Sequence, residues 1–291
     1  MTDRSGLVAG VVLAGGRSAR MGSAKADLDW HGSTLLRRAV GIVGRGVDGP
    51  VVVVRAPGQR LPALPPGVEV VDDPVAGLGP LQGVAAGLRA VAGSAPVAVV
   101  CAVDLPLLHP AFLRRVAREL RADADLDVAL PVAHGHAQPL AAAYRTALAP
   151  RVAALVREGR LRPGMLFERS RVTRLDEAAL LADPVLAAVD PHLESLHNVN
   201  TPEEYRHART RPAPAVRVRC YGALATGVDP GPRTVRAATL AAAATAVDVA
   251  LDPSVVAVLD DAVAHDARVA DPETPLVTGD ALAFLPRAAA G

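Results

Sequence analysis

The chain has 291 residues, of which 51% are hydrophobic and 21% charged, so it has enough apolar material for a packed core and is not a disordered chain. Its net charge of +1 provides no basic field for nucleic acid and no polybasic membrane patch. Two cysteines, Cys101 and Cys220, exclude a disulfide framework and a four-thiolate zinc site. The apolar stretch 7–16 is too short and glycine-broken for a signal peptide or membrane span, so we expect a cytoplasmic protein.

The first two thirds of the chain alternate apolar strands with helices. Strands are predicted at 7–14, 50–54, 68–71, 97–103 and 127–131, and helices at 34–43, 84–92 and 110–120. Continuous apolar strands are typical of parallel sheets that are buried on both faces, and the alternation places helices on both faces. This part is predicted to be an α/β sandwich.

The pattern changes at 209–215, a stretch rich in Pro and Arg that is predicted to be a linker. Beyond it, 216–221 alternates with a period of two, as a strand with one wet face does, and an Ala-rich helix is predicted at 235–246. Residues 216–291 hold six arginines against nine acidic residues. We therefore expect two domains of opposite charge, at 1–208 and 216–291.

A glycine-punctuated loop follows the first strand and contains the chain's single lysine, Lys25, among thirty arginines. The backbone N–H groups of Gly15 and Gly16 can approach phosphate oxygens closely, and Arg20 and Lys25 can supply charge for a triphosphate. The loop is neither a Walker A loop nor a dinucleotide-binding signature. The alternative is a surface turn whose basic residues are solvated.

Asp104 ends the apolar strand 97–103 and directly precedes Leu105 and Pro106. Ligands of open parallel sheets bind at the carboxyl ends of the strands, and a carboxylate there suits Mg²⁺, which also takes phosphate oxygens. The alternative is a helix cap. A glycine loop, two cations and a metal-binding carboxylate together indicate phosphoryl or nucleotidyl transfer.

Four motifs in order resemble those of the MobA-like nucleotidyltransferases, within the sugar-nucleotidyltransferase superfamily. These are the loop 13–25, the nucleobase-side loop 77–83, the metal-site segment 103–106 and the Asn-Val-Asn-Thr-Pro segment 198–202. The resemblance covers residues 7–205 and implies a Rossmann-like three-layer sandwich of the nucleotide-diphospho-sugar transferase type, with a mostly parallel sheet.

The resemblance also implies roles for individual residues. Arg20, Lys25 and Asp104 would be catalytic, Asp104 would hold Mg²⁺, and Asn198 and Asn200 would contact the acceptor. The implied nucleotide-binding residues are Leu13, Ala14, Gly15, Gly16, Lys25, Asp72, Gly79, Pro80, Leu81 and Asp104. Gln82 departs from the alanine that the family commonly has, and Val54-Arg55 replaces its usual asparagine.

Residues 216–291 resemble MoaD-like sulfur carriers with a small α+β, ubiquitin-like β-grasp fold. The resemblance rests on the opening strand, on Thr234-Val235 before a helix, and on the ending 276–286. Members end in Gly-Gly, whose terminal carboxylate is activated. Here the tail ends in Ala290-Gly291. The methyl group of Ala290, where members have glycine, restricts the backbone and puts sulfur transfer to Gly291 in question.

The resemblance implies that GMP is transferred from GTP to molybdopterin with release of pyrophosphate, using Mg²⁺. The second domain could then contact molybdenum-cofactor or sulfur-transfer enzymes. Three alternatives remain: a CTP-dependent enzyme acting on molybdopterin, a sugar-phosphate nucleotidyltransferase, and a non-catalytic adaptor. Intact Lys25 and Asp104 argue against the adaptor.

Overall fold

The computed structural model describes residues 6–15, 24–75, 77–225, 231–260, 267–269 and 271–287. The chain divides into two compact units, one comprising 1–28 and 35–202 and the other 29–34 and 203–291. No helix among the described residues is long and apolar enough to cross a membrane.

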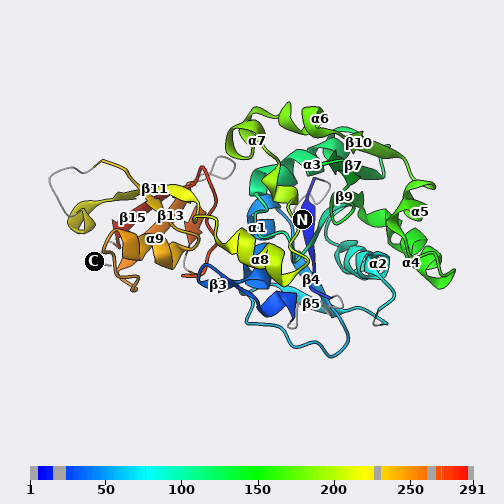
Figure 1. The fold of residues 1–291 in the computed structure, drawn as a ribbon, viewed down its shortest axis with the longest axis horizontal. Coiled ribbons are helices and arrows are strands. Elements are labelled where there is room, and N and C mark those ends of the chain that lie inside the picture. The colour runs from blue at the N-terminus through cyan, green and yellow to red at the C-terminus, as the bar shows by residue number, and fades with distance from the viewer. Residues whose placement is uncertain are drawn as a thin grey trace. The chain divides into compact units, whose positions relative to one another are not determined.

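The first unit is built on one large sheet with the strand order β10-β7-β9-β6-β1-β4-β5, and β8 pairs with β7 (Figure 1). Its strands are β1 (Val8–Leu13), β4 (Val51–Arg55), β5 (Glu69–Asp72), β6 (Val97–Ala102), β7 (Val128–Ala133), β8 (His136–Ala137), β9 (Ala141–Arg145) and β10 (Val172–Leu175). Strand β1 runs parallel to β4 and β6, whereas β9 is antiparallel to both of its neighbours. The sheet is therefore mostly parallel, as predicted.

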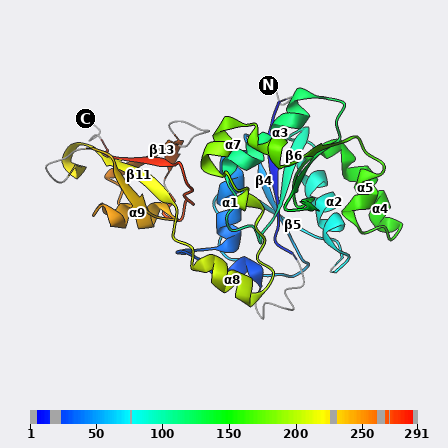
Figure 2. The same cartoon turned by 45° about the horizontal axis from the view of Figure 1, so that its top comes forward.

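Helices cover both faces of this sheet (Figures 1 and 2). They are α1 (Leu35–Gly46), α2 (Pro80–Val91), α3 (Pro110–Ala122), α4 (Ala149–Arg157), α5 (Pro163–Phe167), α6 (Glu177–Leu181) and α7 (Pro184–Val189). Two consecutive residues of β1 contact helices on opposite faces. Gly10 packs so closely on α1 that a Cβ at this position would lie 2.2 Å from the Val43 side chain. Val11 packs on α2, where a Cβ at Gly87 would lie 2.3 Å from the Val11 side chain. Since α3 contacts α1 and α4 contacts α2, the three-layer fold is confirmed.

Two helices begin at residues other than those predicted, for reasons of local sequence. Helix α2 begins at Pro80 rather than Val84, because proline suits the first helical turn and Gly79 adopts a φ of 88° just before it. The helix predicted from Val235 begins only at Leu240, where the Thr239 side chain caps it. Residues 233–236 instead form a strand.

The second unit contains a five-stranded sheet in the order β12-β11-β15-β13-β14. Its elements are β11 (Ala215–Cys220), β12 (Arg233–Arg236), α9 (Leu240–Ala246), β13 (Val255–Asp260), β14 (Ala267–Val269) and β15 (Ala281–Pro286), with a short 3₁₀ turn at Gly222–Leu224. The first and last strands, β11 and β15, pair in parallel at the centre of the sheet, and the other pairs are antiparallel. This order, with one helix after the first hairpin, is the expected β-grasp arrangement.

One side of this second sheet packs on α9. Val216 and Val218 of β11 are buried with Leu240 of the helix and Phe284 of β15, whereas the alternate residues of β11 face solvent. The one-sided strand predicted here is confirmed. The same unit includes the hairpin β2 (Asp29–Trp30) and β3 (Ser33–Thr34), whose Asp29 receives hydrogen bonds from α8 (Pro202–Arg209).

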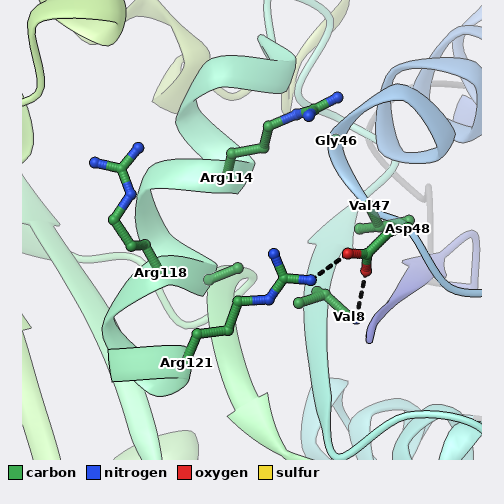
Figure 3. A pocket seen from close by; sticks show the side chains of 8 residues that line it. Val8, Gly46, Val47, Asp48, Arg114, Arg118 and Arg121 are labelled. Carbon is green, nitrogen blue, oxygen red and sulfur yellow. Dashed lines mark hydrogen bonds and ion pairs between the residues drawn. The ribbon is translucent and has the colours of Figure 1, made fainter. Parts of the chain in front are cut away.

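A charged cluster closes the amino end of β1 in the first unit (Figure 3). Asp48 accepts a hydrogen bond of 2.7 Å from the Val8 amide and pairs with Arg121 of α3. Arg114 donates to the Arg45 carbonyl at the end of α1, and Arg118 pairs with Asp183 at 2.7 Å. The cavity of about 210 Å³ between these groups is lined by side chains that already bond to the protein, so we assign it a structural role.

Asp183 caps α7 by accepting hydrogen bonds from the Val185 and Leu186 amides, and its side chain is only 4% exposed. Burial alone would raise its pKa, but these amides and Arg118 hold the pKa below the ordinary value of 3.8. The charged form is therefore the one that stabilises the fold.

We predict that Asp183→Asn lowers the free energy of unfolding at pH 7 by about 1 kcal/mol, because asparagine still caps the helix but cannot pair with Arg118. The deficit should be constant above about pH 5 and disappear as the pH falls through 3.8 toward the lowered pKa of the folded state. Urea unfolding followed by circular dichroism at several pH values measures this. Asp125→Asn, in an exposed ion pair with Arg171, is the matched control and should change little. A deficit that persists at pH 2 would contradict the account.

Candidate functional site

A cavity of about 500 Å³ lies at the carboxyl ends of β1, β4 and β6 in the first unit. The chain passes from β1 to β4 on one side, and later places β6 on the other side of β1. Ligands of open α/β sheets bind at such a reversal of strand order. The lining residues are Leu13, Ala14, Gly15, Lys25, Val54, Arg55, Ala56, Asp73, Gly77, Gly79, Pro80, Gly83, Ala102, Val103, Asp104 and Leu140.

Two lining residues of the cavity, Lys25 and Asp104, meet the side chain of Asn200, which is exposed and is not among the lining residues. The Lys25 ammonium donates to Asp104 Oδ2 at 2.8 Å and to Asn200 Oδ1 at 3.0 Å. The side chains of Lys25 and Asp104 are only 17% and 19% exposed. An ion pair that is mostly buried is screened less by solvent than a surface pair.

The backbone around Asp104 is anchored on both sides. The Val103 amide donates to the Leu13 carbonyl at 3.1 Å, and the Val199 amide donates to the Asp104 carbonyl at 3.0 Å. Arg38, a buried residue of α1, donates from Nε to the Pro106 carbonyl at 2.7 Å. The carboxylate therefore sits on a segment that β1, α1 and residues 198–200 hold in place.

Lys25 is positioned by a short 3₁₀ turn at Lys25–Asp27. Ala26 in this turn is fully buried, the Leu28 amide donates to the Lys25 carbonyl at 3.2 Å, and the turn contacts α1. Burying the neighbouring alanine leaves the long lysine side chain directed to the cavity rather than to bulk solvent.

The end of β1 forms the floor of the cavity. The Ala14 amide donates to the Val54 carbonyl at 2.8 Å, and a Cβ at Gly15 would lie 3.0 Å from the Ala56 nitrogen, so Gly15 must stay small. Gln59 bridges the same two segments, since its amide donates to the Ala14 carbonyl and accepts from the Ala56 amide. The Gly15 amide also donates to the Val54 carbonyl, at 3.3 Å, so the floor is held rigidly against the end of β4.

Another wall contains Gly79 and Pro80, two of the residues predicted to bind nucleotide, together with Asp73 after β5. Gln82 of α2, which is 5% exposed, donates to Asp73 Oδ1 and to the Val75 carbonyl. Burial raises the pKa of Asp73, although hydrogen bonds from Gln82 and the Val75 amide partly offset this.

Several predicted site residues lie elsewhere. Asp72 is half-exposed and pairs with Arg55 at 2.7 Å, and it does not line the cavity. Leu81 is fully buried in the core beneath the wall. Asn198 is exposed and is not among the lining residues that the structure describes. Gly16, Arg20 and Gly291 lie outside the described residues.

Sequence reasoning missed Asp73 and did not connect it with Gln82. The side-by-side carboxylates at the end of β5 offered a signal, because alternate residues near a strand end point to different sides. The resemblance favoured the first of the two, Asp72. The departure at Gln82 was noticed, but its partner could not be identified without the fold.

The donor set at Asp104 fits a divalent cation. One carboxylate oxygen and one amide oxygen already converge on a single positive charge, the Lys25 ammonium. Among the described residues no group of three or more His, Cys, Asp or Glu side chains could hold a metal. A Mg²⁺ ion bound by a single carboxylate would take its other ligands from phosphate oxygens and water, as it commonly does.

Cys101, His134 and His136 are not among the lining residues of this cavity. Cys101 is fully buried in β6, and burial raises the pKa of its thiol to about 12, so it is a small core residue rather than a nucleophile. His134 and His136 are exposed at the turn between β7 and β8, where the His134 amide donates to Glu177.

Comparison with known proteins identifies the class to which this site belongs. The family model described as MobA-like NTP transferase domain matches residues 10–178, more than half of the chain. The chain belongs to this family and is a nucleotidyltransferase. The matched range contains the cavity residues from Leu13 to Leu140 but not Asn200.

Individual relatives are more specific. The chain is 45% identical over 171 residues to a probable molybdenum cofactor guanylyltransferase of Mycobacterium tuberculosis, covering 58% of this chain and 83% of the relative. It is 43% identical over 186 residues to the protein of the same name in Mycobacterium ulcerans, covering 62% and 90%. Among solved structures, molybdopterin-guanine dinucleotide biosynthesis protein A of Archaeoglobus fulgidus matches with a TM-score of 0.56 and 24% identity, over 69% of this chain and 97% of that one. This structural similarity supports the fold of the first unit.

Proposed function

We propose that the first domain transfers GMP from GTP to molybdopterin in a Mg²⁺-dependent reaction that releases pyrophosphate. The observation that carries this proposal is the ion pair of Lys25 and Asp104 in a cavity at the sheet's reversal point, with Asn200 bonded to the same ammonium. The names of the mycobacterial relatives, which match over most of their length, support the choice of nucleotide and acceptor.

The reaction needs positioning and charge neutralisation rather than a protein nucleophile. The terminal phosphate oxygen of molybdopterin attacks the α-phosphorus of GTP, a new P–O bond forms, and the bond to the β-phosphate oxygen breaks as pyrophosphate leaves. Lys25 binds the phosphates and offsets the negative charge that develops on them. Leu13, Ala14 and Gly15, which line the cavity, position the nucleotide against the end of β1.

Asp104 and Asn200 are the residues that would hold Mg²⁺. When bound, the ion neutralises phosphate charge and makes the α-phosphorus more open to attack. Because Lys25 Nζ contacts both oxygens, its ammonium would have to turn toward the phosphates for the cation to bind. Arg38 and Val199 keep the Asp104 segment fixed while this happens.

A CTP-dependent transfer to molybdopterin, or transfer to a sugar phosphate, uses the same end of the cavity and differs only at the base or the acceptor. The relatives' names favour GTP and molybdopterin.

We also propose that the reaction takes place in the cytoplasm. The free thiols of Cys101 and Cys220 are consistent with this reducing compartment.

We predict that Asp104→Asn reduces pyrophosphate release from GTP and molybdopterin by about 100- to 1,000-fold, because one charged oxygen at the metal position is lost. Binding of Mn²⁺, measured by electron paramagnetic resonance without acceptor, should weaken in parallel, while the circular dichroism spectrum stays unchanged. Asp125→Asn, a remote exposed carboxylate, is the control. Unaltered turnover and Mn²⁺ binding in Asp104→Asn would exclude a metal role for this residue.

We further propose that residues 1–208 form the transferase domain, 209–215 the linker and 216–291 a MoaD-like, carrier-type domain. The compact units differ from these bounds in that 29–34 and 203–215 group with the second unit. Helix α8 ends at Arg209 and β11 begins at Ala215, which supports a linker between them. The β-grasp sheet supports the carrier assignment, since its central strand β15 leads directly into the C-terminal residues. This domain would contact molybdenum-cofactor or sulfur-transfer enzymes.

The tail provides the test of the carrier assignment. We predict that Ala290→Gly increases thiocarboxylate formation at Gly291 by a sulfur-transfer system, because the methyl group of Ala290 narrows the conformations open to the tail. Intact-protein mass spectrometry would detect the replacement of oxygen by sulfur. The absence of thiocarboxylate in both forms would favour a domain that only docks a partner.

A further inference from the structure

Two short segments of chain lead away from the polar residues of the site. Three residues separate Lys25 from the hairpin formed by β2 and β3, and Thr201 alone separates Asn200 from α8, which begins at Pro202. The hairpin and the rest of α8 are far apart in the sequence but belong to the same compact unit. A contact that fixes the hairpin to α8 therefore bears on the distance between Lys25 and Asn200.

Four residues join the hairpin to α8, and we call them the hairpin clamp: Asp29, Trp30, Tyr205 and Arg209. Arg209 forms an ion pair with the Asp29 carboxylate and also donates to the Asp29 carbonyl at 3.4 Å. The Tyr205 hydroxyl donates to the same carbonyl. Trp30 is 3% exposed, and its ring centroid lies 6.5 Å from that of Tyr205. The clamp thus combines an ion pair, hydrogen bonds and an aromatic contact.

The clamp supplies much of what holds α8 in place. Ala208 is the single buried residue among the eight of this helix, so apolar burial contributes little to its placement. Tyr205 and Arg209 are four positions apart and share one face of the helix, and both bond to the hairpin. The clamp therefore fixes the helix that directly follows the segment carrying Asn200.

The hairpin is a stiff link between the clamp and Lys25. Its two-residue turn at 31–32 has positive φ angles of 50° and 93°, as in the tight turns that match the twist of paired strands. The Leu35 amide donates to the Leu28 carbonyl at 2.8 Å and closes the base of the hairpin, and the Leu28 amide donates to the Lys25 carbonyl. A force on Asp29 therefore reaches the turn that carries Lys25 through one intervening residue.

We propose that Asp29 and Arg209 are positioning residues of the transferase, whose ion pair sets the distance between Lys25 and Asn200. Lys25 Nζ donates directly to Asn200 Oδ1 at 3.0 Å, but the proposed reaction breaks this bond because the ammonium turns toward the phosphates. Asp29 and Arg209 do not line the cavity, so a nucleotide bound there leaves their contact in place. The clamp then keeps Lys25 near the phosphates and Asn200 near the cation. The inference rests on the proposed function.

The ion pair is the part of the clamp that substitutions can reverse. The side chains of Asp29 and Arg209 are 56% and 36% exposed, so each position accepts a residue of opposite charge without burying it. An ion pair this exposed contributes little to the free energy of unfolding. Its effect on the site can therefore be separated from an effect on the stability of the fold.

The test reverses the two charges separately and together in the full chain. Arg209→Asp and Asp29→Arg each place like charges against one another, which should push α8 and the hairpin apart. We expect each variant to lower kcat for GMP transfer by about 10- to 100-fold and to change KM for GTP by less than about 3-fold, since the end of β1 still binds the nucleotide. Combining the two substitutions should restore kcat to within about 3-fold of the wild-type value.

Two readouts do not require the reaction. Binding of the Mn²⁺–GTP complex, measured by electron paramagnetic resonance without acceptor, should weaken about 10-fold in each single variant and recover in the double variant. Trp30 is the chain's only tryptophan, so quenching of its fluorescence by acrylamide reports on the clamp and should increase in the single variants. Circular dichroism spectra and urea unfolding should stay close to those of the wild type.

Arg206→Asp is the matched control, since Arg206 is an exposed arginine of the same helix outside the clamp. It should leave kcat, Mn²⁺–GTP binding and Trp30 quenching unchanged. Three results would each overturn the proposal. These are wild-type kcat and Mn²⁺–GTP binding in Arg209→Asp despite increased Trp30 quenching, an equal loss in Arg206→Asp, and a double variant no better than its single parents.

The inference and the proposed function fail separately. Weaker Mn²⁺–GTP binding in the single variants and its recovery in the double variant, in a chain that transfers no GMP to molybdopterin, would support the positioning role and refute the proposed function. GMP transfer by the wild-type chain that neither charge reversal alters would do the opposite.

Discussion

The parallel pairing of β1 with β4 and β6 is the constraint on which the rest of the site depends. It places Leu13 at the level of Val54 on one side and of Ala102 on the other, so three strand ends open at one edge. The helices on both faces pack closely against β1, and a side chain at Gly10 or Gly87 would clash with Val43 or Val11. A sheet packed this tightly can hold loops to a fixed geometry.

The charges of the site are built on that rigid base. Lys25 and Asp104 are 79 residues apart and Asn200 is 175 residues from Lys25, yet their polar atoms meet within 3.0 Å. In a chain whose other Lys/Arg positions are all arginine, this single lysine places a compact ammonium between two oxygens. Phosphates and a cation would take over the contacts that Lys25 makes with Asp104 and Asn200.

Much of this could be predicted from the sequence, because buried parallel strands are continuous apolar runs and the loops that follow them carry the chemistry. The sequence alone predicted the strands that contain Val11, Val52 and Val99. It also predicted that Lys25 and Asp104 lie in the loops at the ends of two of these strands. The strand at 233–236 could not be separated from the following helix, since its pairing with β11 is a tertiary contact. Asp73 was hidden for the same reason: its partner Gln82 lies on another element.

The account's central claim is that one cavity joins a guanine nucleotide to a phosphate acceptor. Mass spectrometry of the products formed from molybdopterin, Mg²⁺ and either GTP or CTP tests it most directly. The account predicts a GMP adduct of molybdopterin, with pyrophosphate, from GTP alone. A CMP adduct would contradict the base assignment, and the absence of any adduct would contradict the assigned acceptor.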